Sequence, residues 1–383
     1  MKELGIYVHI PFCKRKCDYC DFVSYAQKDD IIEKYINSVI KEIDYVSNKI
    51  IKEQYNINTI YIGGGTPSYI DSKYIKMILS KIKQKFKNNI DEKIEITIEI
   101  NPGTVNEEKL LEYKNTGINR ISIGVQSTSD RLLKEIGRIH TFEEFLEIYN
   151  MARKKGFSNI NIDMILGLPG QTEKDIDEMS DVISKLNPEH VSVYSLILEE
   201  GTCLYQKVKK GIAKLPDEDI ERQMYWKTKK NLENIGYKHY EISNFAKPGF
   251  ESKHNLNCWK QKEYIGIGLS AHSYLDNSRF SNISDLEKYI ENIQNDEYEK
   301  NKIIHEVQNE KIKQKEFVML GLRMIDGVSI LGFSKKFGKE LVQVFNEEIN
   351  RLIEKNLIEI TETRIKLTEK GLDFANIVWQ EFV

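Results

Sequence analysis

Long apolar runs, net charge and cysteine are all scarce in this 383-residue chain, and each shortage excludes a class of protein. No apolar run approaches the roughly 20 residues that a membrane-spanning helix needs, so no such helix is predicted. The formal net charge is only −3, which provides no general field for attracting nucleic acid. The N-terminus shows no signal-peptide pattern. We therefore expect a soluble, cytoplasmic protein that has no transmembrane segment and does not bind nucleic acid.

The chain has only five cysteines, but their placement is informative. An odd number, with three of them close together, is a poor disulfide framework. Cys13, Cys17 and Cys20 have the spacing C-x3-C-x2-C, whereas the other two cysteines stand alone far downstream. Three thiolates in a loop can hold a tetrahedral metal or three corners of an iron–sulfur cluster. Zinc stays open as an alternative, although structural zinc usually brings its ligands as two separated pairs.

The first 200 residues alternate between short β-branched runs and longer amphipathic runs. The predicted strands are 4–10, 59–62, 94–100, 120–124, 159–165 and 190–196. The predicted helices are 31–53, 72–86, 107–114, 141–155 and 173–185, with N-caps at Asp71, Asn106 and Thr172. This alternation favours a parallel sheet. A closed eight-stranded barrel would need two more units, so the predicted fold class is α/β, an open partial (β/α)6 TIM-like barrel.

Beyond residue 200 the alternation breaks down. We predict a barrel over 1–200, a barrel extension over 201–283 and a small C-terminal helical domain over 284–383. A helix is predicted over 217–234 and a glycine-interrupted strand or turn over 264–274, whereas 295–315 could be a helix or a linker. The remaining predicted elements are typical of a winged-helix module. They are helices over 317–324 and 339–355, short strands at 358–360 and 364–367, and a last helix. In a net acidic chain this module indicates a structural appendage rather than DNA binding.

Chemically unusual residues follow the predicted strands. They are the cysteines after the first strand, glycines 63–65 after the second, Asn101 after the third, Gln126 after the fourth and the segment 167–170 after the fifth. The carboxyl ends of parallel strands meet at one edge, where barrel and open α/β enzymes place their active sites. The sequence therefore predicts one functional face.

The cysteine loop resembles a known family. The pattern H-I-P-F-C-x3-C-x-Y-C over residues 9–20 is similar to the radical S-adenosylmethionine (SAM) superfamily, specifically its coproporphyrinogen-dehydrogenase-like branch. The resemblance implies that Cys13, Cys17 and Cys20 hold a [4Fe–4S] cluster whose open iron chelates the amino and carboxylate groups of SAM. In that superfamily, reduction cleaves SAM to methionine and a 5′-deoxyadenosyl radical.

Further positions resemble the SAM pocket of this superfamily. Glycines let backbone groups approach a polar ligand, carboxylates can accept from ribose hydroxyls, and an arginine can offer a fork to a carboxylate. The residues that the resemblance implies are Tyr7, Gly64, Gly65, Thr66, Glu99, Gln126, Arg138 and Asp163. Taken alone, each has an ordinary structural explanation, such as a tight turn, a rim charge or a buried tyrosine. Together with the cysteines, these residues favour the pocket over such explanations. The glycine strip and the pocket positions argue against a zinc-stabilised binding module.

The branch divides into an oxygen-independent coproporphyrinogen III oxidase and a HemW-like group of heme chaperones. The oxidase resembles C-x3-C-x2-C-x-C, but Phe22 stands two positions beyond Cys20 here, as in the HemW-like pattern. The oxidase also has a longer N-terminal extension. The HemW-like motif H-N-x-x-Y-W is matched by H-N-L-N-C-W at 254–259, which makes His254 the candidate heme residue. The resemblance implies heme delivery to an acceptor hemoprotein, such as a membrane-associated respiratory protein; the oxidase is the alternative.

One position departs from the HemW-like motif, because Cys258 occupies the usual tyrosine slot. A thiol could ligate heme iron as an axial or auxiliary ligand. Most free cysteines simply pack, and packing is the favoured interpretation for Cys258.

Overall fold

The computed structural model describes residues 1–50 and 54–382, so the end of the helix predicted over 31–53 lies outside the described residues. Each of the six predicted strands is present. They are β1 (Lys2–Ile10), β4 (Tyr55–Gly64), β5 (Ile90–Ile100), β6 (Arg120–Gln126), β7 (Ile160–Leu166) and β8 (His190–Ser195). Each pairs in parallel with the next in this order. The predicted α/β partial barrel is therefore confirmed.

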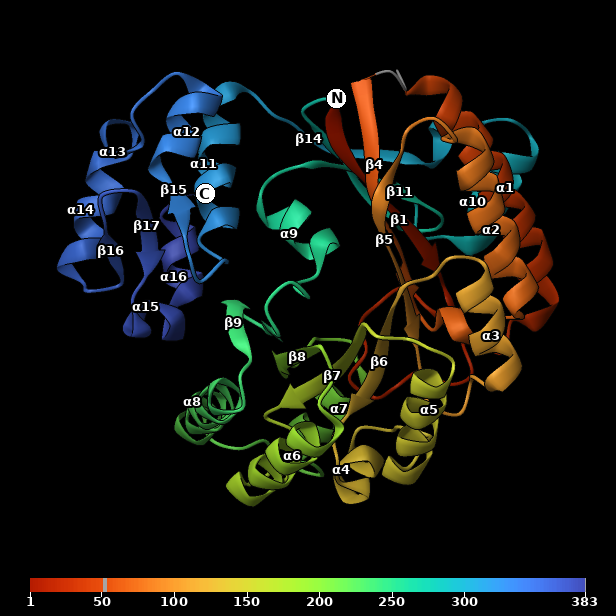
Figure 1. Ribbon diagram of the computed structural model, residues 1–383, viewed down its shortest axis with the longest axis horizontal. Coiled ribbons are helices and arrows are strands. Elements are labelled where there is room, and N and C mark those ends of the chain that lie inside the picture. The colour runs from red at the N-terminus through yellow and green to blue at the C-terminus, as the bar shows by residue number, and fades with distance from the viewer. Residues whose placement is uncertain (51–53, 383) are drawn as a thin grey trace.

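Helices cover the outer face of the curved sheet (Figure 1). They are α1 (Ile32–Lys49), α2 (Ser72–Lys85), α3 (Glu107–Asn115), α4 (Asp130–Glu135), α5 (Phe142–Lys154) and α6 (Glu173–Leu186). The side chains of Asp71, Asn106 and Thr172 each accept a hydrogen bond from a backbone N–H in the first turn, as predicted. The helix starts are thus fixed locally, before any packing.

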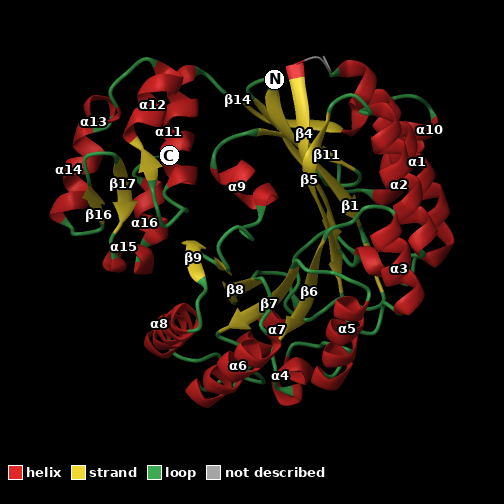
Figure 2. Ribbon diagram, viewed as in Figure 1, coloured by secondary structure: helices red, strands yellow, loops and turns green. Residues whose placement is uncertain are grey.

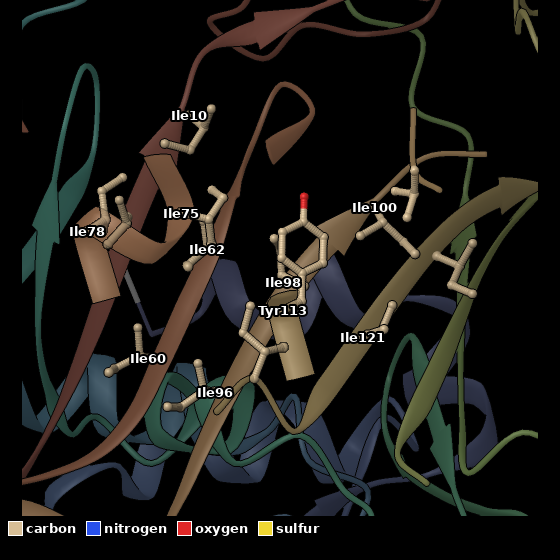
Figure 3. Close-up of a cluster of buried hydrophobic side chains, with 14 of the residues drawn as sticks. Ile10, Ile60, Ile62, Ile75, Ile78, Ile96, Ile98, Ile100, Tyr113 and Ile121 are labelled. Carbon is tan, nitrogen blue, oxygen red and sulfur yellow. The ribbon is translucent and has the colours of Figure 1, made fainter. Parts of the chain in front are cut away.

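Buried isoleucines pack these helices against the sheet. Residues 94–100 of β5 read I-E-I-T-I-E-I, and Ile96, Ile98 and Ile100 are buried in the main core. Figure 3 shows them beside Ile75 of α2 and Tyr113 of α3. Because successive side chains of a strand point to opposite faces, the glutamates and the threonine between these isoleucines face the inside of the barrel. Strands of parallel sheets are usually apolar on both faces, so this barrel has an unusually polar interior.

The sheet continues on both sides of the six strands. The added strands are β9 (Lys238–Glu241), β10 (Asn244–Ala246), β11 (Glu263–Ile267), β12 (His272–Leu275), β13 (Ser278–Asn282) and β14 (Lys302–Val307). In the described part of the chain the full order is β14-β13-β12-β11-β1-β4-β5-β6-β7-β8-β10-β9. The segment predicted as a strand or turn over 264–274 forms β11 and β12, and β11 pairs with β1 in parallel.

The prediction of a helix or a linker over 295–315 was wrong for residues 302–307. They form β14, which pairs antiparallel with β13. Its side chains are mostly exposed, so the local pattern gives little sign of a strand. The hydrogen bonds that stabilise it come from a partner strand, which local propensity does not report.

Several short elements connect the sheet to the rest of the chain. Two-residue strands β2 (Phe12–Cys13) and β3 (Tyr25–Ala26) pair beside the cysteine loop. The connecting helices are α7 (Cys203–Lys209), α8 (Glu218–Asn234), α9 (Lys253–Trp259) and α10 (Leu286–Gln294). Three-residue and four-residue 3-10 turns occur at Asp29–Ile31, Pro67–Tyr69 and Tyr298–Asn301. The helix predicted over 217–234 is confirmed as α8.

The C-terminal part has its own hydrophobic core around Phe333. Its elements are α11 (Glu310–Gly321), β15 (Val328–Ser329), α12 (Ile330–Phe337), α13 (Leu341–Val344), α14 (Asn346–Glu354), β16 (Ile358–Ile360), β17 (Arg364–Leu367), α15 (Glu369–Asp373) and α16 (Ala375–Gln380). Figure 2 shows helices around a small sheet, as predicted, although the helix expected over 339–355 is divided at Phe345. No helix within 1–50 and 54–382 is long and apolar enough to cross a membrane.

Ile98→Ala tests the packing between sheet and helices. Ile98 is fully buried, so the truncation should lower the free energy of unfolding of the barrel by about 2–5 kcal/mol through lost burial and a cavity. Urea unfolding followed by far-ultraviolet circular dichroism measures the change. Leu111→Ala on the exposed side of α3 is the control and should change it by less than about 0.5 kcal/mol. Equal effects of the two variants would contradict this packing.

Candidate cofactor site

A cavity of about 500 Å³ opens at the carboxyl edge of the parallel strands. This volume is in the range of small-ligand sites. Of the residues predicted for the site, all but Tyr7 and His254 line it. Those that the structure brings together are Cys13, Cys17, Cys20, Gly64, Gly65, Thr66, Glu99, Gln126, Arg138 and Asp163.

The loop that carries the cysteines is tied to the barrel at Asp18. The backbone N–H of Asp18 donates to the carbonyl of Ile136 at 3.1 Å. Its carboxylate lies 2.6 Å from Nζ of Lys207, which comes from α7. Within the loop, the N–H of Cys20 donates to the carbonyl of Cys17 at 3.2 Å. These contacts with α4 and α7 hold the thiols against the mouth of the barrel.

The three thiols differ in their surroundings. Burial raises the pKa of Cys13, and it raises the pKa of Cys20 to about 11. Thr66 Oγ1 donates to Cys13 Sγ at 3.5 Å, and the Arg138 guanidinium donates to Cys17 Sγ at 3.4 Å. In the described residues, no group of three or more His, Cys, Asp or Glu side chains is gathered tightly enough for one metal ion. The thiols therefore share a cavity without converging on one point.

The glycine strip passes very close to the cysteine loop. The N–H of Gly65 donates to the carbonyl of Ile10 at 2.9 Å. A Cβ at Gly65 would lie 2.8 Å from Cys13 Sγ. Gly64 has a φ of +125°, and a Cβ there would lie 2.9 Å from the Ile10 carbonyl oxygen. Both positions therefore require glycine, and they leave bare backbone facing the cavity.

Two partly buried carboxylates line the cavity. Glu99 accepts from the Tyr61 hydroxyl at 2.8 Å and from the N–H of Gly64 at 3.2 Å. Asp163 accepts from Ser122 Oγ at 3.0 Å and from Asn161 Nδ2 at 2.7 Å. Burial, together with the charge of Asp163, raises the pKa of Glu99 to about 7, and burial also raises the pKa of Asp163. The wall can attract a cation or accept hydrogen bonds from hydroxyl groups.

Arg138 adds a partly buried cation to the lining of the cavity. Its guanidinium donates to Asn101 Oδ1 at 3.0 Å and to the carbonyl of Gly124. Its Nε is buried and has no partner among residues 1–50 and 54–382. Beside it, Gln126 adopts a left-handed backbone with a φ of +71°, which is uncommon for a residue with a side chain. The spare donor and the thiol contact place Arg138 between the cysteine loop and the strand ends.

Tyr7 and His254 lie behind Tyr61 rather than in the cavity. The Tyr7 ring stacks on that of Tyr61 with centroids 6.2 Å apart, and its hydroxyl is 3.0 Å from His9 Nδ1. His254 is carried by α9, and its ring lies 5.1 Å from that of Tyr61. Its Nδ1 is 2.9 Å from Thr59 Oγ1. Burial lowers the pKa of His254 to about 4, so the ring is neutral.

Sequence reasoning missed several polar residues that line the cavity or lie beneath it. Tyr61 and Ser122 line the cavity, and His190 lies deeper, with Nδ1 2.6 Å from Asn161 Oδ1. The available signal was the alternation of apolar and polar residues along most of β5 to β8. In strands buried on both faces, that alternation indicates a polar interior.

The comparisons with known proteins agree with this geometry. The family model described as "Radical SAM superfamily" matches residues 7–183, and "HemN C-terminal domain" matches 313–374. The structure is similar to coproporphyrinogen III oxidase (HemN) of Escherichia coli, with a TM-score of 0.87 and 22% identity, covering 100% of this chain and 90% of the other. At 22% identity, this similarity establishes the fold and nothing further. The fold is that of a radical SAM protein.

Relatives along the whole chain narrow this class further. Heme chaperone HemW of Bacillus subtilis is 38% identical over 378 residues, which is 98% of each chain. Heme chaperone HemW of Lactococcus lactis is 37% identical over 382 residues, which is 100% of this chain and 98% of the relative. The chain therefore belongs to the HemW family of the radical SAM superfamily.

A [4Fe–4S] cluster and SAM are the cofactors of this superfamily, and the residues present fit both. Three thiols on one cavity wall are the donor set for three irons of a cluster. The cavity has the volume for a small ligand, and the glycine strip, the buried carboxylates and the spare donor of Arg138 offer polar contacts around it.

Replacing Cys13, Cys17 or Cys20 with Ala should abolish the cluster. After anaerobic reconstitution, iron and sulfide contents should fall to background, because three thiolates are needed to hold it. Circular dichroism should show an intact barrel, since the main core lies on the other face of the sheet. Cys203→Ala, at an exposed thiol on α7, is the matched control and should keep full iron content. Full iron and sulfide in any of the three variants would contradict the assignment.

Proposed function

We propose that this protein is a heme chaperone, which binds heme and passes it to an acceptor hemoprotein. The observation that carries the proposal is similarity over the whole chain to proteins named heme chaperone HemW, at 38% and 37% identity. The motif at 254–259 and the position of Phe22 support it. The likeness to the oxidase HemN concerns the fold and does not by itself favour an oxidase.

The cavity is proposed as the cofactor site. Cys13, Cys17 and Cys20 would hold the cluster and leave one iron for SAM. The strip at 64–66 would receive the methionine end of SAM, while the wall of Glu99 and Asp163 would accept hydrogen bonds from it. The planar guanidinium of Arg138 can donate paired hydrogen bonds to a carboxylate, and Gln126 adds an amide that can donate or accept a hydrogen bond. When bound, cluster and SAM supply one-electron chemistry, which a carrier can use as a redox or regulatory device.

His254 is the proposed heme residue. Its Nδ1 is engaged by Thr59, which fixes the ring and leaves Nε2 as the nitrogen that can face iron. The residue is only 8% exposed, so heme binding at this ring requires α9 to move. Because α9 has seven residues and lies inside the curve of the sheet (Figure 1), a shift of this helix leaves the main core intact.

Cys258 is proposed to pack rather than to bind heme. Burial raises its pKa to about 11, so the thiolate that would ligate iron is scarce at neutral pH.

The proposal places the protein in the cytoplasm, with a membrane-associated respiratory hemoprotein as one class of acceptor. All five cysteines are free thiols, and cluster thiolates must stay reduced. Reduced thiols are typical of the cytosol.

Heme titration of the anaerobically reconstituted protein tests the function. Cluster absorbance near ~400 nm should be followed by a distinct Soret band that saturates at one heme per chain. His254→Ala should weaken heme binding at least about tenfold, while Cys258→Ala should leave the spectrum and affinity unchanged. His272→Ala, at an exposed histidine of β12, is the matched control. Heme-loaded protein mixed with an apo-hemoprotein should then transfer its heme.

Two results would contradict the proposal. A cluster-loaded protein that shows no Soret band on heme addition does not bind heme. Reproducible conversion of coproporphyrinogen III to protoporphyrinogen, with SAM and without oxygen, would identify the oxidase instead.

A further inference from the structure

Arg120, the first residue of β6, carries a buried charge that its neighbours leave without a direct bond. The residue is 2% exposed. Among the residues that the structure describes, Nε of its guanidinium is fully buried and has no hydrogen-bond partner. By contrast, Arg153 lies 2.8 Å from Glu189. Burying an unpaired charge is costly, so a nearby charge must compensate for Arg120.

The register of the sheet places Arg120 at the floor of the cofactor cavity. Arg120 pairs with Thr97 on β5, and the next inward-facing residues toward the carboxyl edge are Ser122 on β6 and Glu99 on β5. Same-face positions on a strand are about 7 Å apart, which is one long side chain. Ser122 donates to Asp163 of β7 at 3.0 Å. The guanidinium therefore lies one layer below both carboxylates of the cavity wall.

The charges around Arg120 match this placement. Burial raises the pKa of Glu99 and Asp163, and the positive charge of Arg120 acts against that rise in both. Burial lowers the pKa of His190 and His254, and Arg120 lowers both further, so these rings are neutral. The charge of Arg120 also affects the pKa values of two phenols, Tyr61 of β4 and Tyr240 of β9. Burial raises both pKa values, and the positive charge of Arg120 acts against that rise.

We propose that Arg120 is a positioning residue of the SAM site, the internal counter-charge of Glu99 and Asp163. It acts through the two carboxylates and does not touch the ligand. The inference rests on the proposed role of Glu99 and Asp163 in binding SAM. Without the cation, two adjacent buried carboxylates repel each other and take up a proton.

The sign of the pH dependence follows from the carboxylates. SAM carries a net positive charge and donates hydrogen bonds through its ribose, so ionised carboxylates bind it better than protonated ones. The pKa of Glu99 is about 7, so SAM affinity should rise as the pH increases through 7. Removing the positive charge of Arg120 raises that pKa further, which moves the rise in affinity to higher pH.

The experiment measures the Kd for SAM of the reconstituted, cluster-loaded protein by anaerobic equilibrium dialysis between pH 6 and pH 9. Arg120→Gln should move the midpoint to higher pH, by up to about one pH unit. A full unit would weaken the affinity at pH 7 by about fivefold, because it lowers the ionised fraction near the midpoint by that factor. Arg120→Lys keeps the charge and should retain a profile close to that of the unchanged chain. Arg131→Gln removes a half-exposed arginine charge of α4 and is the control.

Several outcomes would overturn the inference. Arg120→Gln could leave the profile unchanged, or Arg120→Gln and Arg120→Lys could weaken SAM binding equally at every pH, as a merely structural residue would. If Arg120→Gln does not fold, the double variant Arg120→Gln with Glu99→Gln decides, because removing both charges should restore cluster loading and thermal stability. Failure of the double variant to recover would also overturn it. Absence of SAM binding by the unchanged chain would instead contradict the cofactor proposal.

Discussion

Packing of isoleucines between the sheet and its helices determines what the inside of the barrel can hold. In β5 the apolar positions are fixed by contact with α2 and α3, so every second residue must face inward. Those inward residues include Glu95, Thr97 and Glu99. The same alternation continues through β6, β7 and β8, which places arginine, asparagine, aspartate and histidine in the interior. A polar chamber inside a parallel sheet is thus a direct consequence of the outer core.

Two proposed sites share one wall of this chamber. The hydroxyl of Tyr61 donates a hydrogen bond to Glu99 in the cofactor cavity. The ring of Tyr61 lies against that of His254 on the other side. His254 is carried by α9, whose last residue Trp259 lies under the guanidinium of Arg323 at 4.3 Å. Arg323 also lies 4.7 Å from the ring centre of Trp379. The proposed heme residue is therefore in contact with both the wall of the cavity and, through α9, the C-terminal module.

The sequence was sufficient for features that depend on local pattern. The six strands follow from β-branched runs, and caps such as Asn106 follow from side chains that bond their own first turn. The candidate residues of the site came from the resemblance to the radical SAM superfamily, which the spacing of the three cysteines indicates. Features that depend on distant partners were missed. Strand β14 forms by pairing with β13, and the proposed role of Arg120 depends on side chains from β5 and β7. The burial of His254 depends on the way α9 packs against β4, which no local pattern reveals.

The thiols of the cysteine loop are proposed to hold a cluster with one iron open to SAM. Electron paramagnetic resonance of the reduced, reconstituted protein tests it most directly, with and without SAM. A signal typical of a reduced [4Fe–4S] cluster, whose g-values shift when SAM is added, is the predicted result, because SAM then coordinates the open iron. A cluster signal that SAM leaves unchanged, or no cluster signal after reconstitution, would contradict the claim.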